Sequence, residues 1–413
     1  MILTRISQRS VVFFCMPEIG HFNRLKSLIS GLNQRGITAH VFTHRNFEPQ
    51  VARSGGIFFD LFSKYPLEQA DDTSFPVPCR FVSYAATYAR QICHDVERIQ
   101  PSLVIHDTFA VIGRLVATLL GIPRVNVCAG HNMNPARFLE LLQKDPRVKL
   151  SSKCLHAVKE LRESYSMADA SPFSYVSSIS PHLNIYCEPP EFLEEWERKA
   201  FEPIAFYGSI PFPDEMQSDH QENRIYFGAD SGDWLKIYVS FGTVIWRSFT
   251  NPALRALTTL AGTFNHMESV QAIISLGMAK ISNETLAALV GPNVSVQTYV
   301  DQWRMLQEVD VFFTHQGMNS THEAIFHRVP MVSYPFFSDQ PALAEKCQQF
   351  GLAIPLTDSL QGTFSDDDVW GALAKLAKER EQIQLALSRA REWEEAVIEN
   401  RPAVLQRIVD LIQ

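Results

Sequence analysis

The sequence lacks the features of a nucleic-acid-binding protein and of a disulfide scaffold. It has no run of five or six Lys and Arg residues, and its formal net charge is −8. A phosphate backbone or an anionic membrane surface is therefore not expected as the main partner. The seven cysteines are odd in number and form no Cys-x-x-Cys pair. This pattern favours reduced thiols and provides neither a disulfide framework nor a zinc site.

Long hydrophobic runs are also missing near the N-terminus. The apolar run after Arg5 and Arg9 covers only residues 11–16. A signal-peptide core needs roughly 7–15 such residues, and a membrane span needs about 18 or more. The sequence therefore predicts a cytoplasmic protein without stable membrane insertion.

What is present is an alternation of short apolar strands and amphipathic helices. Residues 10–16 have strand character, residues 23–35 carry apolar side chains at helical spacing before Gly36, and residues 39–43 predict the next strand. The same order returns at residues 102–105, 110–120 and 124–128. Such alternation is typical of a parallel sheet with helices on both faces.

A Pro-rich stretch, residues 203–213, is the best candidate for a domain boundary. After it, strands are predicted at residues 235–241, 270–276, 294–299, 309–313 and 331–334, and helices at 251–264 and 320–326. Residues 366–413 are charged and helical. A chain of 413 residues has room for two domains, or for three. We expect two α/β domains with a cleft between them.

Several familiar catalytic and nucleotide-binding motifs are absent. The chain contains no G-x-G-x-x-G, no G-x-x-x-x-G-K-[ST] and no G-x-S-x-G. His322 and His327 are five residues apart, which puts them on different faces of a helix and argues against a zincin site. No metal site is predicted.

Residues 313–323, between a predicted strand and a predicted helix, contain the densest set of candidate ligand-binding residues. Backbone N–H groups at a helix start bind anions such as a diphosphate. The side chains of His315 and Ser320 could add further hydrogen-bond donors to it. Glu323, one turn further on, is placed to accept hydrogen bonds from ribose hydroxyls. The alternative is an ordinary capped helix, with Asn319 or Ser320 as the N-cap and Glu323 in a capping box.

Two further motifs follow strands of the same predicted sheet. Residues 240–243 (Ser-Phe-Gly-Thr) offer close backbone approach at Gly242 and a hydroxyl donor at Thr243. Asp339 and Gln340 provide the acceptors and donors that sugar hydroxyls require, although a surface loop with a helix cap would explain them too. Ligands of open α/β sheets bind beyond the carboxyl ends of the strands, where these motifs are expected.

Residues 311–356 resemble the nucleotide-sugar-binding signature of family 1 glycosyltransferases, including the bacterial macrolide and natural-product branch. Their sequence is VFFTHQGMNSTHEAIFHRVPMVSYPFFSDQPALAEKCQQFGLAIPL. Residues 16–36 are similar to that family's acceptor-side opening (MPEIGHFNRLKSLISGLNQRG), and residues 239–243 to its phosphate-loop strand (VSFGT). Residues 101–123 correspond to the segment that carries the family's acidic partner (PSLVIHDTFAVIGRLVATLLGIP). The resemblance extends over about residues 10–360.

The resemblance implies a GT-B fold with two Rossmann-like domains that face a central cleft. The acceptor-binding domain would cover residues 1–215 and the donor-binding domain residues 225–389. The last helix, about residues 390–413, would pack back on the first domain. No cofactor is implied beyond the nucleotide-sugar co-substrate.

The resemblance also implies roles for individual residues. His21 corresponds to the general base and Asp107 to the carboxylate that orients it. Thr243, His315, Asn319 and Ser320 would hold the diphosphate beside Gly242 and Gly317, and Glu323 the ribose. Val300 would contact the nucleobase edge through its backbone in the segment that includes Gln302. Asp339 and Gln340 would bind the sugar.

The residues themselves are compatible with this chemistry. A lone His is more often structural than catalytic, but His21 follows the first strand and Asp107 ends another, so the two side chains can meet. His106 competes for the role of base, and strand alternation should turn it to the opposite face. His21 would take the acceptor's proton as the acceptor oxygen attacks the anomeric carbon. A single displacement inverts the configuration.

Three departures from the family pattern concern the donor and acceptor segments. The usual His-Gly-Gly is His315-Gln316-Gly317, which predicts a bulky side chain beside the diphosphate. Asp301 replaces a Pro and adds negative charge near the nucleotide, and Asn23-Arg24 replaces Asn-Pro after the predicted base.

The leading hypothesis is an inverting glycosyltransferase of natural-product or antibiotic biosynthesis, monomeric or homodimeric. It would transfer sugar from UDP-glucose, or as second choice from a TDP-deoxysugar, to a hydroxyl of a hydrophobic small molecule. The alternatives are a nucleotide-sugar epimerase or hydrolase on the same fold, and a catalytically silent auxiliary or binding protein.

Overall fold

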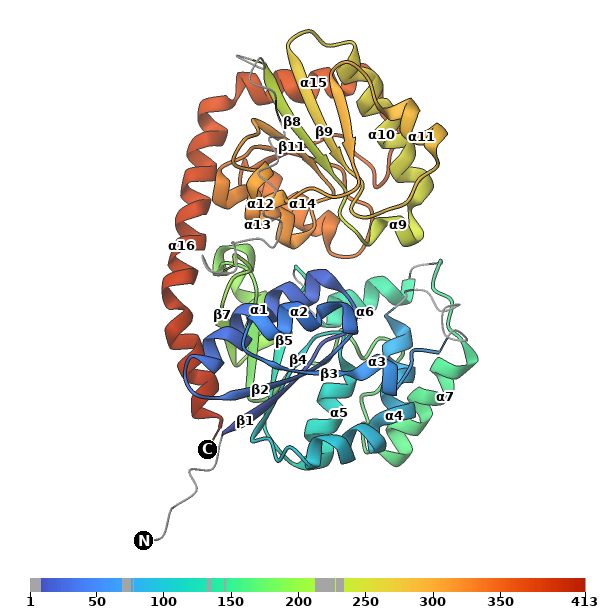
Figure 1. The fold of residues 1–413 in the computed structure, drawn as a ribbon, viewed down its shortest axis with the longest axis vertical. Helices are drawn as coiled ribbons and strands as arrows, with labels where there is room; N and C mark the ends of the chain where they lie inside the picture. The colour runs from blue at the N-terminus through green and yellow to red at the C-terminus, as the bar shows by residue number, and fades with distance from the viewer. Residues whose placement is uncertain are drawn as a thin grey trace. The chain divides into compact units, whose positions relative to one another are not determined.

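The computed structural model describes residues 9–68, 76, 78–131, 135–144, 146–211, 227 and 234–412. The chain divides into two compact units, one formed by residues 1–212 and 397–413 and the other by residues 213–396 (Figure 1). Each unit contains one sheet in which every strand pair is parallel. The two α/β domains predicted from the strand–helix alternation are therefore confirmed.

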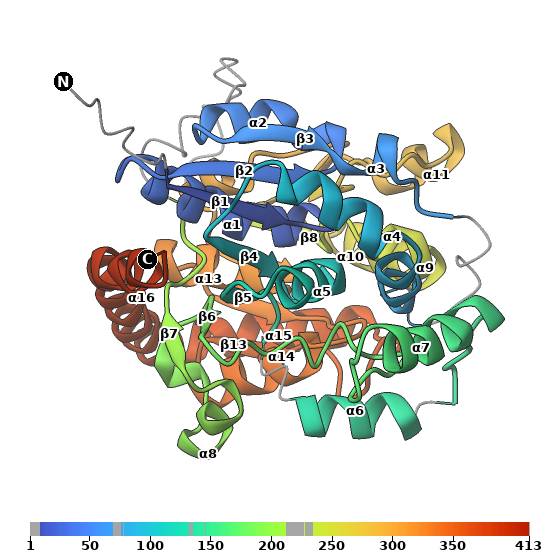
Figure 2. The same ribbon diagram turned by 90° about the horizontal axis from the view of Figure 1, so that it is seen from below.

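The first unit has a seven-stranded sheet in the order β3-β2-β1-β4-β5-β6-β7, which can be followed in Figure 2. The strands are β1 (Ser10–Phe14), β2 (Thr38–Thr43), β3 (Ile57–Asp60), β4 (Leu103–Asp107), β5 (Arg124–Cys128), β6 (Leu183–Tyr186) and β7 (Ile204–Phe206). β7 lies within the Pro-rich stretch 203–213, so part of that stretch belongs to the first sheet. β4 extends to Asp107, two residues beyond the predicted end, and this brings the carboxylate to the sheet edge.

The helices of the first unit pack against this sheet. They are α1 (Ile19–Asn33), α2 (Glu48–Arg53), α3 (Leu61–Lys64), α4 (Cys79–Glu97), α5 (Val111–Leu120), α6 (Pro135–Lys144), α7 (Ser152–Ser164) and α8 (Glu195–Arg198). α4 packs against both α5 and α7, and Val12, Phe14 and Val104 of the sheet join their apolar side chains in one buried cluster. α5 ends at Gly121 with φ +64°, as the C-terminal glycine predicts.

The second unit repeats the plan with a six-stranded sheet in the order β10-β9-β8-β11-β12-β13. Its strands are β8 (Leu235–Ser240), β9 (Val270–Ser275), β10 (Val294–Gln297), β11 (Val311–Thr314), β12 (Met331–Ser333) and β13 (Ala353–Pro355). Its helices are α9 (Ile245–Ser248), α10 (Thr250–Asn265), α11 (Asn283–Leu289), α12 (Gln302–Met305), α13 (Met318–His327), α14 (Gln340–Gln349) and α15 (Asp366–Lys378).

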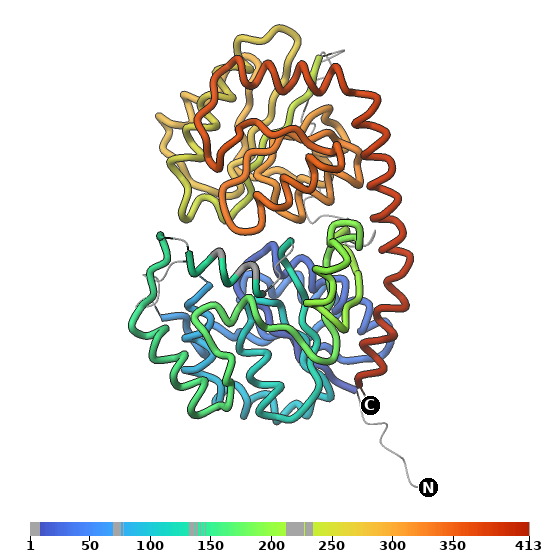
Figure 3. Tube along the Cα trace, turned by 180° about the vertical axis from the view of Figure 1, so that it is seen from behind, coloured from blue at the N-terminus to red at the C-terminus, as the bar shows by residue number. Residues whose placement is uncertain are grey.

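The long helix α16 (Arg380–Asp410) belongs to both units, with residues up to 396 in the second and the remainder in the first (Figure 3). In the first unit, the buried Arg401 donates to the carbonyl oxygen of Tyr207 at 2.8 Å and also to that of Ile210. Leu405 packs where Gly31 of α1 has no side chain, since a Cβ there would lie 2.6 Å from Leu405 Cδ1. The helix end is therefore an integral part of the first unit.

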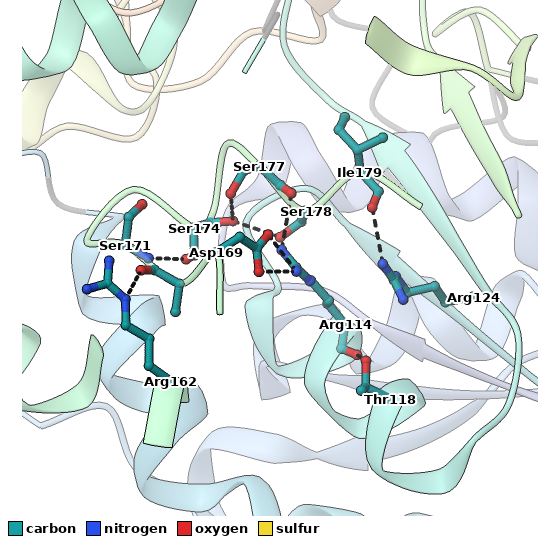
Figure 4. Close-up of polar contacts among 11 residues, drawn as sticks. Arg114, Thr118, Arg124, Arg162, Asp169, Ser171, Ser174, Ser177, Ser178 and Ile179 are labelled. Atoms are coloured by element: carbon teal, nitrogen blue, oxygen red, sulfur yellow. Dashed lines mark hydrogen bonds and ion pairs between the residues drawn. The ribbon is translucent and has the colours of Figure 1, made fainter. Parts of the chain in front are cut away.

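The segment between α7 and β6 has little regular structure and is held by side chains of the neighbouring helices (Figure 4). Arg114 of α5 binds both carboxylate oxygens of Asp169 at 2.7 Å and also the carbonyl oxygen of Ser177. Arg162 donates to the carbonyl oxygen of Ala170. These bonds satisfy backbone groups that a strand or helix would otherwise pair.

In the part of the chain that the structure describes, none of the helices combines the length and the apolarity needed to cross a lipid bilayer.

Candidate active site

Most of the predicted site residues lie near one edge of their sheet, just beyond the carboxyl ends of the strands. In the first unit the chain changes direction between the adjacent strands β1 and β4, and in the second between β8 and β11. Such switch points are where open α/β sheets bind their ligands. His21 and Asp107 lie at the first switch point, and Gly242 and His315 follow the two strands of the second.

The structure brings His21 and Asp107 together, although 86 residues separate them in the sequence. His21 Nδ1 lies 3.0 Å from Asp107 Oδ1. The Asp107 side chain is fully buried, whereas that of His21 keeps 15% of its surface exposed. An ionised carboxylate only accepts hydrogen bonds, so Nδ1 carries the imidazole proton and Nε2 keeps its lone pair. This arrangement fits a general base that is oriented by a carboxylate.

His21 and two backbone N–H groups lower the pKa of Asp107 in spite of its burial. Asp107 Oδ2 accepts from Met16 N at 2.9 Å, and Oδ1 accepts from Phe109 N at 2.7 Å. Burial alone would raise the pKa of Asp107, but the hydrogen bond and charge of His21, together with these two N–H groups, lower it below its ordinary value. The carboxylate is thus a fixed negative charge against the imidazole.

The predicted helix over residues 23–35 left His21 in the loop before it, but the structure places His21 within the helix. Helix α1 begins at Ile19, four residues before the predicted start, so His21 is in its first turn. Glu18 precedes the helix with extended backbone, and its carbonyl oxygen accepts from His21 N at 3.1 Å. The helix therefore fixes the backbone of the candidate base.

His106 takes no part in this pair. It is fully buried, and its Cβ lies where a side chain at Gly113 of α5 would clash, at 2.5 Å. Burial lowers the pKa of His106 to about 4, so the imidazole is neutral at physiological pH.

In the second unit, His315 packs against two glycines. A Cβ at Gly317 would lie 2.3 Å from His315 Nε2, and one at Gly242 would lie 2.8 Å from the same atom. Gly242 also has φ +73°, a conformation that favours glycine. Thr243, the next residue, is exposed. The two glycines thus let the imidazole lie between the loops that follow β8 and β11.

His315 is a neutral imidazole in this structure. Burial lowers its pKa to about 4, against the smaller effect of a hydrogen bond to the backbone of Ser240. Its Nδ1 is buried and has no hydrogen-bond partner among the described residues. A buried polar atom without a partner is uncommon and marks a place where a ligand can bind.

The N-terminus of α13 carries a connected set of polar side chains. Gln302 Nε2 donates to Glu323 Oε2 at 2.7 Å and to Ser320 Oγ at 3.1 Å, and Ser320 Oγ lies 3.3 Å from Gln302 Oε1. The helix begins at Met318 with Gly317 as its N-cap. The alternative of a capping box built on Asn319 or Ser320 is therefore wrong, and Asn319 lies in the first turn.

Comparisons with known proteins show similarity to glycosyltransferases. The model of the family "UDP-glucoronosyl and UDP-glucosyl transferase" matches residues 217–391. The NDP-glycosyltransferase YjiC of Bacillus subtilis is 24% identical over 384 residues, which cover 88% of this chain and 91% of the relative. Residues 217–391 thus match this glycosyltransferase family, and the relative that covers most of the chain is a glycosyltransferase.

Solved structures show that the transferase has the GT-B fold. The glycotransferase of kitacinnamycin superimposes with a TM-score of 0.77 at 21% identity, over 98% of this chain and 99% of that chain. The spinosyn rhamnosyltransferase SpnG, complexed with thymidine diphosphate, gives a TM-score of 0.63 at 16% identity, over 97% and 100%.

One departure of the transferase from the family pattern has a different consequence from the one predicted. The side chain of Gln316 is fully buried and does not project beside the diphosphate loop. Gln316 Oε1 accepts from Ser333 Oγ at 2.9 Å, and Nε2 donates to Thr321 Oγ1 at 3.2 Å. The backbone at φ +61° turns the side chain into the space between β12 and α13. The expected obstruction is therefore wrong.

The side chains at the other two departures, Asp301 and Arg24, have partners within the protein. Asp301 caps α12 by accepting from Arg304 N, and its carboxylate lies 3.6 Å from the Arg304 guanidinium, which offsets its charge. Arg24 is buried and donates to the carbonyl oxygen of Ala129.

The remaining predicted donor residues lie on the same unit of the transferase. Val300 is buried, with 4% of its surface exposed, so its backbone contact with a nucleobase stays a prediction from the resemblance. Gln340 begins α14, and its Oε1 accepts from Phe336 N at 2.9 Å and Phe337 N at 3.3 Å. Its carboxamide oxygen is thus engaged in shaping the loop that ends at Asp339.

Sequence reasoning missed the contribution of Phe109 to the pair formed by His21 and Asp107. Its place two residues after Asp107 was the available signal, because a residue at that distance can donate its N–H to the carboxylate.

Among the described residues, no three His, Cys, Asp or Glu side chains form a group that could hold a metal ion. The metal independence of the transferase stays a prediction from its family.

Proposed function

We propose that the protein is an inverting glycosyltransferase that transfers a sugar from a nucleotide-diphosphate sugar to a hydroxyl group of a hydrophobic small molecule. The contact of 3.0 Å between His21 Nδ1 and Asp107 Oδ1 at the β1–β4 switch point carries this proposal. UDP-glucose is the preferred donor, as the family name and the relatives indicate, and a TDP-deoxysugar is the second choice. Natural-product or antibiotic biosynthesis is the proposed setting, since the similar structures belong to that chemistry.

The first unit supplies the acceptor side of the reaction. His21 Nε2 takes the proton of the acceptor hydroxyl while its oxygen forms a bond to the anomeric carbon. Asp107 stabilises the imidazolium that results. The half-buried ring of Phe109 beside His21 favours an apolar acceptor surface at this point.

The second unit supplies the donor side. The N-terminus of α13, a helix of ten residues, offers backbone N–H groups and its dipole to the diphosphate. His315, Thr243, Asn319 and Ser320 add side-chain contacts. As the bond from the anomeric carbon to the diphosphate oxygen breaks, these groups hold the negative charge that the leaving group gains.

The other donor contacts follow from the network around α13. Glu323 and Gln302 are placed to bind the ribose hydroxyls, and the backbone of Val300 the edge of the nucleobase. Asp339 and the amide NH₂ of Gln340 bind hydroxyls of the sugar, since the carboxamide oxygen of Gln340 is used by the loop.

The donor is tested by thermal unfolding with UDP, TDP, ADP and GDP. A nucleotide at 100 times its dissociation constant should add about 2.7 kcal/mol of apparent stability. We expect the largest shift with UDP. A preference for TDP would assign a deoxysugar donor, and the absence of a shift with any of the four would overturn the donor site.

The mechanism is tested with His21→Ala and with the stereochemistry of the product. The variant should bind UDP as the wild type does and lose transfer by about 10²–10⁴-fold, the usual contribution of a general base. An α-linked donor should give a β-glycoside, which NMR of the anomeric proton can establish. An α product, or near-normal turnover of the variant, would contradict the proposal.

The alternative functions have less support. An epimerase or hydrolase would consume the donor without an acceptor, which the same assay detects. A silent auxiliary protein was suggested by Gln316 and Asp301, but the first is buried away from the loop and the second is paired with Arg304. A cytoplasmic location and a monomeric or homodimeric state remain proposals.

A further inference from the structure

Phe109 contacts both members of the proposed catalytic pair. Its backbone N–H donates to Asp107 Oδ1 at 2.7 Å, the same oxygen that faces His21. Its ring lies against the imidazole of His21, with 4.2 Å between the ring centroids and 39° between the planes. Asp107 therefore restrains the imidazole at one edge, and Phe109 restrains it at one face.

The surroundings hold Phe109 in this position. Tyr175 meets the ring edge-on at 5.3 Å and 85°, and Phe81 lies at 6.3 Å. The backbone before and after it is fixed too, because Thr108 N donates to the carbonyl oxygen of Val127 and Ala110 N to that of Asp107. A ring restrained on several sides can transmit its position to the imidazole that it touches.

The contact with the imidazole matters when the imidazole becomes charged. A cation within about 6 Å of an aromatic centroid is attracted to the ring face. His21 is neutral while it waits for the acceptor and becomes an imidazolium as it takes the proton. The ring of Phe109 thus favours the state that forms during transfer, in addition to keeping Nε2 pointed at the acceptor.

On these grounds we infer that Phe109 is a positioning residue of the transfer reaction, which holds the His21 imidazole by its ring and the Asp107 carboxylate by its backbone N–H. The inference rests on the proposed function, in which His21 is the base. It assigns to Phe109 a part that an ordinary core phenylalanine would not have.

The charged groups near His21 remain in place when only the ring of Phe109 is changed. Asp107 belongs to β4, Glu18 precedes α1, and Arg80 of α4 lies 3.9 Å from Glu18 Oε1. The buried thiol of Cys15 also lies near Asp107, which together with burial raises the pKa of the thiol. A side-chain substitution at 109 retains the N–H bond to Asp107, so it tests the ring alone.

The test compares Phe109→Leu, Phe109→Tyr and the control Phe201→Leu, which removes a buried ring of the same unit that packs against Tyr186. For Phe109→Leu we expect kcat to fall about tenfold, as the loss of a desolvated cation–π contact predicts. The KM for the donor should be unchanged, and the acid limb of the pH–rate profile should move to lower pH. Phe109→Tyr keeps the ring and should restore kcat to within about threefold.

The control separates positioning from packing. Phe201→Leu should lower the thermal unfolding midpoint as much as Phe109→Leu or more, because Phe201 is fully buried, but it should leave the acid limb in place. Equal kcat and equal pH profiles for the two Leu variants would overturn the inference, as would a Phe109→Tyr variant no better than Phe109→Leu.

His21→Ala distinguishes failure of this inference from failure of the proposed function. If His21→Ala retains transfer, His21 is not the base and the proposed mechanism fails. If His21→Ala is inactive while the two Leu variants behave alike, only the role of Phe109 is wrong.

Discussion

His322 of α13 and Glu394 of α16 form a fully buried pair, with 2.5 Å between His322 Nδ1 and Glu394 Oε1. In the sequence, His322 lies between Ser320 and Glu323, which belong to the proposed donor site, but its imidazole pairs with a residue of α16. The second carboxylate oxygen, Glu394 Oε2, has no hydrogen-bond partner among the described residues. The pair thus ties the donor helix α13 to α16, as does the Arg391 guanidinium over the ring of Phe326.

Removal of His322 should therefore destabilise the second unit strongly. In His322→Leu the buried Glu394 carboxylate loses its partner, which costs about 3–5 kcal/mol for buried pairs. The double variant His322→Leu with Glu394→Leu should recover part of this loss, since no unpaired charge remains. Thermal unfolding measures both.

A control is available on the same helix. Arg391 and Glu395 form a partly exposed pair, and Glu395→Ala, which leaves Arg391 over the ring of Phe326, should change stability by about 1 kcal/mol or less. A single His322→Leu variant as stable as this control would show that the buried pair contributes nothing.

Gln316→Gly restores the usual residue of the family and should nevertheless destabilise the protein. The variant loses the buried bonds to Ser333 and Thr321, at about 1 kcal/mol each, while glycine relieves about 1 kcal/mol or more of left-handed strain at φ +61°. We expect a small net loss of stability and unchanged binding of UDP. Calorimetric titration provides the affinity.

Gln302→Ala is the matched comparison for Gln316→Gly, because the carboxamide of Gln302 lies in the proposed donor site instead of the core. It should weaken UDP binding. Tighter nucleotide binding by Gln316→Gly would mean that Gln316 does obstruct the site.

Gly317→Ala should impair nucleotide binding because the new Cβ would lie 2.3 Å from His315 Nε2. The imidazole would have to move away from the N-terminus of α13, and we expect the affinity for UDP to fall about tenfold or more. Gly262→Ala, in helix α10 with no atom within 4 Å of the new Cβ, is the control. It should keep the affinity and gain up to about 1 kcal/mol of stability.

Acidification should destabilise the protein through His327. Burial, followed by the charge of Arg391, lowers the pKa of His327 to about 4, below the value of about 6.5 that it has when unfolded. Between these values the unfolded chain binds more protons at His327 than the folded one. The contribution of His327 to the free energy of unfolding is therefore fully present above about pH 6.5 and is lost as the pH falls toward 4.

The variant His327→Phe isolates this contribution. His327 Nε2 has no hydrogen-bond partner among the described residues, and Trp303 meets the imidazole edge-on at 4.3 Å, so another ring can replace it. Stability measured from pH 7 to pH 4 should fall less steeply in the variant. Identical slopes in the two proteins would refute the contribution of His327.

Local patterns predicted much of the fold and several close approaches of the site. The alternation of strands and helices predicted both parallel sheets, and Gly121 ended α5 as expected. Gly242 was expected to permit close backbone approach and the family resemblance implied Gly317 beside the diphosphate, and both glycines lie against His315. These features depend on a few residues that are close in the sequence, so they can be predicted from the sequence alone.

The errors arose where tertiary contacts decide. Helix α1 begins at Ile19 although Glu18 provides no side-chain cap and Gly20 is a poor helix former. The tertiary bond from His21 to Asp107 compensates for this weak start. For Gln316, the sequence named the bulky residue correctly but could not predict that a positive φ turns its side chain into the core.

The sequence by itself determined the two α/β domains, the resemblance to glycosyltransferases and the residue types at the ends of the strands, because hydrophobic period and motif spacing are local properties. The tertiary structure decided which of those residues meet. His21 reaches Asp107 across 86 residues because β1 and β4 are neighbours in the sheet, and His322 reaches Glu394 across 72 because α16 packs on α13. Strand order and helix packing bring these groups within hydrogen-bond distance, and no local pattern encodes that distance.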